Sequence, residues 1–107
     1  MTIQILHYEF LGPIKLSEWG PPMDKVVYII FNQNKSGFIP LHAGESDKTD
    51  QKDFFTQNDN FKCWIQHAGN EESLYLAILP LWESEAPERK RIVDKIILKY
   101  RPLCQTE

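Results

Sequence analysis

The chain has 107 residues, a formal net charge of −3 and a hydrophobic fraction of 42%. This length fits one domain and excludes a second core, and the negative total argues against a protein whose whole surface attracts nucleic acid. No apolar run approaches the roughly 20 residues that span a bilayer, so no membrane association is expected. The N-terminal residues lack the basic then apolar order of a signal peptide, which predicts a cytoplasmic protein with two reduced cysteines, Cys63 and Cys104.

The charge is unevenly divided along the chain. The middle is acidic, with Glu45, Asp47, Asp50, Asp53 and Asp59, and the end is basic, with Arg89, Lys90, Arg91, Lys95, Lys99 and Arg101. A local basic face can attract phosphates whatever the total charge. A solvated helix face that binds nothing explains the same pattern, and both interpretations stay open.

The first 22 residues are predicted to form an arm or lid on a core at residues 23–105. Residues 3–10 alternate loosely in polarity, which indicates an edge strand or extended arm, and Gly12-Pro13 is expected to end it. The segment Trp19-Gly20-Pro21-Pro22 is a stiff, non-helical approach to the core, because proline fixes its own φ and restricts the residue before it.

A β-hairpin is predicted next. The run Val26–Phe31 is β-branched and aromatic, as in a buried strand, and residues 32–37 are turn formers. A second apolar run follows over Phe38–Ser46. Tyr28 and His42 bring polar side chains to these two strands, so a site could be built there.

The rest of the chain predicts helices packed on this hairpin. Ser46 or Asp47 could cap a short helix through about Phe55, and the apolar run 61–65 ends at Ala68-Gly69 as a helix C-cap or turn. A strand over residues 73–79, closed by a proline, should pair with the hairpin.

The last helix has the clearest pattern. Pro87 suits a first turn, Pro102 ends the helix, and one apolar stripe runs between them, made of Ile92, Val93, Ile96, Ile97 and Tyr100. The fold class is therefore α+β, with a small, three-stranded, mainly antiparallel sheet flanked by helices.

The order of these landmarks resembles the GIY-YIG nuclease superfamily, in particular its small bacterial members. The similar segments are Trp19–Pro22, Val27–Ile30, Ala43–Ser46, Cys63–Ile65 with Ala68-Gly69, and the closing helix with Tyr100–Cys104. Each motif is short, and the resemblance covers roughly residues 10 to 105 through their order and spacing.

The resemblance implies a metal-dependent phosphodiesterase that cuts DNA, with two tyrosines, an arginine and a metal-binding glutamate. Tyr28 matches the first tyrosine, His42 stands at the second and Lys52 at the arginine. Val93 stands at the glutamate, and a hydrocarbon cannot ligate Mg²⁺ or Mn²⁺. Asp94 is a weak substitute, because one residue turns a helical side chain by about 100°.

These departures predict a catalytically degenerate GIY-YIG-like domain that needs no cofactor and binds nucleic acid or a protein partner. The binding residues expected for DNA are Arg89, Arg91, Lys95 and Gln105, the last standing where the family has an asparagine. The alternative is an atypical endonuclease that uses Tyr28, His42 and Lys52 with Mg²⁺ or Mn²⁺. A third interpretation is a regulatory protein that binds a partner through its acidic middle.

One further pattern is a zinc site. Cys63 and His67 are four residues apart, which places them on one helix face, and Cys104 and His42 could complete the ligands. A second Cys-x-x-Cys or His-x-x-x-His half is absent. A buried thiol beside a surface histidine explains the same spacing, so no metal site is expected.

Overall fold

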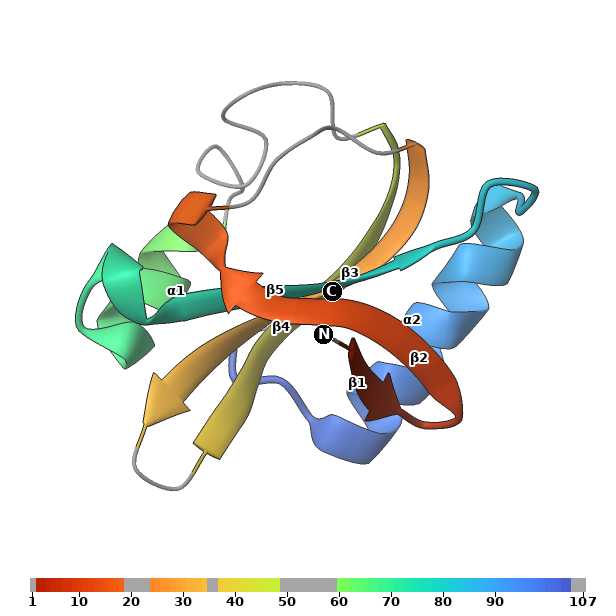
Figure 1. The fold of residues 1–107 in the computed structure, drawn as a ribbon. Coiled ribbons are helices and arrows are strands. Elements are labelled where there is room, and N and C mark those ends of the chain that lie inside the picture. The colour runs from red at the N-terminus through yellow and green to blue at the C-terminus, as the bar shows by residue number, and fades with distance from the viewer. Residues whose placement is uncertain (1, 19–23, 35–36, 49–59, 105–107) are drawn as a thin grey trace.

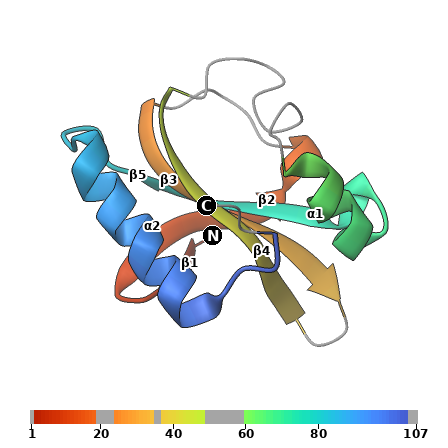
Figure 2. The same ribbon diagram turned by 180° about the vertical axis from the view of Figure 1, so that it is seen from behind.

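The computed structural model describes residues 2–18, 24–34, 37–48 and 60–104, which form an α+β fold. Within these ranges the strands make one five-stranded antiparallel sheet in the order β1-β2-β5-β3-β4, with helices α1 and α2 on opposite faces (Figures 1 and 2). The elements are β1 (Thr2–Ile5), β2 (Tyr8–Lys15), β3 (Asp24–Asn34), β4 (Gly37–Lys48), α1 (Phe61–Ala68), β5 (Leu74–Pro80) and α2 (Ala86–Tyr100), with short 3-10 turns at Leu16–Glu18 and Glu71–Ser73.

The sheet has more strands than the three that were predicted, because the N-terminal segment also joins it. β1 pairs with β2, and β2 pairs with β5, so much of the predicted arm is an integral part of the structure. Gly12-Pro13, whose peptide bond is cis, lies within β2 and does not end it. The register shifts between Leu11 and Ile14, and such an irregularity accommodates a proline within a strand. Gly12 is needed there, since a Cβ would lie 2.6 Å from the Leu76 carbonyl oxygen.

The hairpin and its third strand are confirmed. β3 and β4 pair antiparallel, and β5 pairs with the other edge of β3. The helix cap predicted at Ser46 or Asp47 is wrong, because β4 continues to Lys48 and both residues lie in it. Phe55 and the Trp19–Pro22 segment lie outside the described residues.

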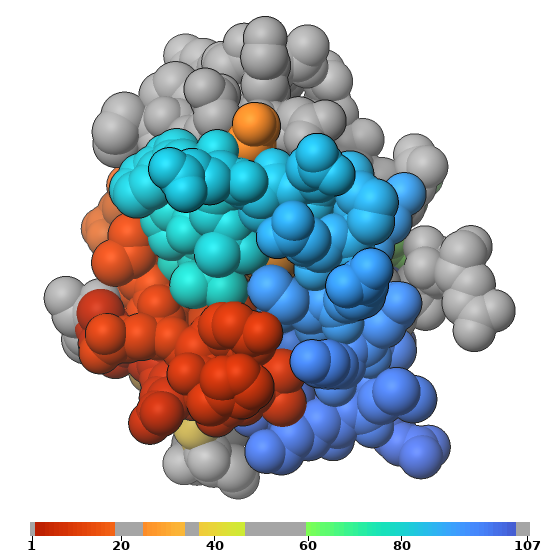
Figure 3. Space-filling view, turned by 90° about the vertical axis from the view of Figure 1, so that its right-hand side faces the viewer, coloured from red at the N-terminus to blue at the C-terminus, as the bar shows by residue number. Residues whose placement is uncertain are grey.

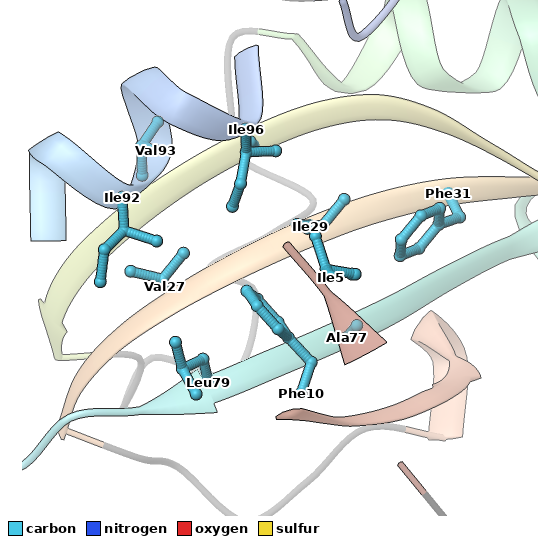
Figure 4. Packing of buried hydrophobic residues seen from close by; sticks show 11 residues of the cluster. Ile5, Phe10, Val27, Ile29, Phe31, Ala77, Leu79, Ile92, Val93 and Ile96 are labelled. Carbon is cyan, nitrogen blue, oxygen red and sulfur yellow. The ribbon is translucent and has the colours of Figure 1, made fainter. Parts of the chain in front are cut away.

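The two faces of the sheet carry separate hydrophobic clusters, because successive strand residues point to opposite sides. On one face the stripe of α2 packs on Val27 and Ile29, as Figure 4 shows, and the predicted stripe is confirmed. On the other face Trp64 of α1 is fully buried against Tyr28 and Leu41. A single sheet thus divides the core of this small domain into two halves.

The cysteines are not free thiols. Cys63 of α1 and Cys104, which follows α2, form a disulfide. The segment after α2 turns back along β4, where the Cys104 N–H donates to the Leu41 carbonyl at 2.7 Å. The prediction of reduced cysteines rested on their small number, and the number of cysteines does not reveal that two of them meet in space.

No helix in the described ranges combines the length and apolar character that a bilayer crossing requires.

Candidate functional site

Tyr28 and His42 lie on neighbouring strands and on the same face of the sheet. Tyr28 is opposite Gly44, and His42 is opposite Ile30, two pairs further along. The two rings are 6.0 Å apart between centroids, and the His42 ring is 5.3 Å from that of Trp64. The structure therefore brings together the two residues that the family resemblance assigns to catalysis.

The Tyr28 ring lies directly over the backbone of β4. A Cβ at position 44 would be 2.6 Å from the Tyr28 hydroxyl oxygen and 3.3 Å from His42 Nε2. Gly44 is thus required by the packing of the tyrosine and the histidine. The close approach fixes the Tyr28 hydroxyl against the strand.

Both side chains are buried, Tyr28 at 4% exposure and His42 at 7%. Burial raises the pKa of Tyr28 to about 12, and the negative charge of Glu45 adds to this shift. Burial lowers the pKa of His42, while a hydrogen bond with the backbone of Cys104 acts in the opposite direction. Both groups are therefore neutral at pH 7, and both resist ionisation because the charged form would lose water contacts.

Two buried nitrogens in this region have no hydrogen-bond partner in the described part of the chain, His42 Nδ1 and Trp64 Nε1. An unsatisfied buried polar atom costs about 1–3 kcal/mol. Burial of the His42 ring beneath Trp64 of α1 therefore lowers the stability of the fold through these two nitrogens. This enclosure of the His42 ring does not suit a general base, which must be within reach of the proton that it abstracts.

Val93 does not lie beside Tyr28 and His42. It belongs to the α2 cluster with Val27 and Ile29, whereas Tyr28 belongs to the α1 cluster on the opposite face of the sheet. The position that the resemblance assigns to the metal-binding glutamate is therefore separated by the sheet from the two rings. Asp94 is solvent-exposed on α2 and offers no replacement ligand beside the two rings.

Arg89 is fully buried, with 0% exposure, and does not lie on the exposed basic face. Its Nε donates to Glu45 Oε2 at 2.9 Å, and one terminal nitrogen donates to the Ser84 carbonyl and hydroxyl oxygens, each at 3.0 Å. This network ties α2 to β4. The signal for it was present in the sequence, since Arg89 precedes Ile92, Val93 and Ile96 at the spacing of the buried stripe.

The outer side of α2 is cationic. Its exposed basic side chains are Lys90, Arg91, Lys95 and Lys99, followed by Arg101 just after the helix. None of them forms an ion pair with any residue that the structure describes. Figure 3 shows α2 at the molecular surface alongside the N-terminal strands. The other two predicted site residues, Lys52 and Gln105, lie outside the described ranges.

No protein-family model matches this chain, and searches of curated proteins and of solved structures found no match either. The GIY-YIG resemblance therefore stays a prediction.

Proposed function

We propose that this protein is a non-catalytic binding domain that holds a nucleic acid on the exposed face of α2. The observation that carries the proposal is the charge between residues 90 and 101, where five cations accompany one carboxylate, Asp94. Arg91, Lys95 and Lys99 recur every four residues and form a row along the helix, with a rise of about 6 Å between neighbours. Such a row can follow a phosphate backbone, which makes binding sensitive to salt.

The contacts that hold α2 on the rest of the domain favour this role. The opposite side of the helix is held by apolar packing and by the ion pair of the buried Arg89 with the partly exposed Glu45. The cations therefore project from a rigid element, and binding requires little ordering of the backbone. An isolated helix of 15 residues would be only marginally stable in water, so this support matters for presenting the charges.

The endonuclease alternative has less support. Tyr28 and His42 are buried beneath α1, and Val93 lies across the sheet from them. A phosphodiester would have to displace α1 to reach the two rings. Nicking of supercoiled plasmid by the wild-type protein with Mg²⁺, and its loss in Tyr28→Phe, would overturn the non-catalytic proposal.

The binding proposal is tested by fluorescence anisotropy with labelled duplex DNA over a range of salt concentrations. We expect weak binding at low salt and a log–log salt slope that falls by about 2 in the double variant Arg91→Ala/Lys95→Ala, since each lost phosphate contact removes about 0.9. The matched control is Lys15→Ala/Lys62→Ala, which removes the same charge elsewhere on the surface. The ion pair of Lys15 with Glu72 is long, at 3.9 Å, and the Lys15 side chain is 40% exposed, so loss of the pair should cost little stability.

Equal weakening by both double variants would show that only total charge matters. No binding by the wild-type protein at low salt would contradict the proposal outright.

A further inference from the structure

Three potential metal ligands meet where α1 approaches the segment after α2. One ligand atom from each of Cys63, His67 and Cys104 lies within 4.8 Å of the other two. Cys63 and His67 share one face of α1, and Cys104 comes from a segment 41 residues beyond Cys63. Cys104 is buried and His67 is exposed, so the group lies at the boundary between core and solvent.

The backbone that carries these residues is held by contacts other than the disulfide. The His67 carbonyl accepts a hydrogen bond from Asn32 Nδ2 at 3.3 Å, which fixes the end of α1 against β3. Trp64, one residue after Cys63, is completely buried. On the other side, the Cys104 N–H donates to the Leu41 carbonyl at 2.7 Å. Reduction of the disulfide therefore leaves the three side chains close together.

We infer that Cys63, His67 and Cys104 form a Zn²⁺ site when the cysteines are reduced, and that the disulfide is the oxidised state of the same site. Two thiolates and an imidazole are a ligand set that suits zinc, which takes four ligands in a tetrahedron. The fourth position faces solvent on the His67 side and is filled by water. The site thus takes a borderline-soft divalent cation, and Mg²⁺ does not compete for it.

The two states interconvert by thiol–disulfide exchange with a low-molecular-weight disulfide. The thiolates of Cys63 and Cys104 give up two electrons and form the protein S–S bond. The S–S bond of the small disulfide breaks, and its two sulfurs accept the electrons, together with two protons from the solvent, to become thiols. Zn²⁺ is released without a change in its own charge. In either state a covalent or coordinate link joins α1 to the segment after α2.

The test is a Zn²⁺ titration of the reduced, metal-free protein against a chromophoric chelator, repeated with Co²⁺ to detect thiolate coordination by absorption. We expect one Zn²⁺ per chain and at least about tenfold weaker binding in His67→Ala, since even groups that only support a metal ligand are worth about 10–100-fold. The matched control is His7→Ala, which removes another exposed histidine and should bind as the wild type does. The His67 hydrogen bond to Asn32 uses the backbone, so His67→Ala keeps it.

Two results would overturn the inference. The first is equal Zn²⁺ affinity in the wild type and His67→Ala, which would mean that the histidine is not a ligand. The second is a reduced wild-type protein that does not bind Zn²⁺, with circular dichroism showing that it is still folded. Addition of the small disulfide to the zinc-loaded protein should release one Zn²⁺ for every two protein thiols lost, and release without thiol loss would exclude the redox link.

Discussion

The buried polar groups on the two faces of the sheet have different surroundings. On the α1 face, Tyr28 and His42 are enclosed in an apolar cluster, and their burial opposes ionisation. On the α2 face, the charged Arg89 is equally buried but is satisfied by Glu45 and Ser84. The remaining cations of α2 are exposed to solvent.

This difference shows that residue type is a poor guide to role in this domain. The residues that resemble catalytic groups contribute to a core, and one residue that resembles a DNA contact contributes to the attachment of a helix. A polar side chain is interpretable only once its face of the sheet and its hydrogen-bond partners are known. Substitutions at Arg89, Val93 and His42 test this contrast.

Replacing Arg89 by Met should lower the free energy of unfolding by about 3–5 kcal/mol, because the partly buried carboxylate of Glu45 and the buried oxygens of Ser84 lose their donor. Urea unfolding measures the change. The control Arg91→Met removes an exposed cation from the same helix and should change stability by no more than about 0.5 kcal/mol. The double variant Arg89→Met/Glu45→Leu should recover part of the loss, since it also removes the carboxylate that Arg89→Met leaves without its partner. Equal stability of the two single variants would show that the ion pair of Arg89 with Glu45 does not matter.

Replacing Val93 by Glu tests whether the sheet really separates this position from Tyr28 and His42. A carboxylate in the apolar α2 cluster should cost about 2–4 kcal/mol of stability and should not create affinity for Mg²⁺. Urea unfolding with and without Mg²⁺ measures both effects, and Asp94→Glu is the neighbouring, exposed control. Stabilisation of Val93→Glu by Mg²⁺ would instead support the GIY-YIG alignment.

Replacing His42 by Gln should make stability less dependent on pH, which is the smallest of the three effects. Because the pKa of His42 is lowered in the folded state, the unfolded state binds the proton more readily. The wild type therefore has full stability above the unfolded value of about 6.5 and loses stability as the pH falls from there to the lowered pKa. Thermal melts between pH 7.5 and 5 compare the two proteins. His7→Gln, which alters an exposed histidine, should follow the wild type.

The parts of the fold with a strong local pattern could be predicted from the sequence. The hairpin and β5 have β-branched or apolar runs bounded by turn residues or proline, and α2 has a stripe at helical spacing. The N-terminal segment was expected to be one edge strand or extended arm that ends at Gly12-Pro13, because a glycine-proline pair normally ends a strand. The shifted register that retains this pair within β2 depends on β5. The disulfide was missed for a similar reason, since it joins segments that meet only in the folded chain.

The candidate site was predicted only in part. The placement of Tyr28 and His42 on neighbouring strands followed from the hairpin, but the position of Leu41 depends on an irregularity in β4. The register shifts between Ile30 and Phe31, which leaves Leu41 unpaired and places it in the α1 cluster next to His42. Strict alternation of sides along the strand cannot predict this. Whether Val93 faces the same site required knowing which helix covers which face.

The segment after α2 also affects how the molecule behaves at high concentration. β4 is an edge strand of 12 residues, and long unprotected edges favour pairing with strands of other chains. The carbonyls of Pro40 and Leu41 already accept hydrogen bonds from the N–H groups of Leu103 and Cys104. This segment therefore caps part of the edge, and the cross-link at Cys104 keeps the cap in place. Deletion of the chain from Leu103 onward would therefore expose this edge and open a route to aggregation.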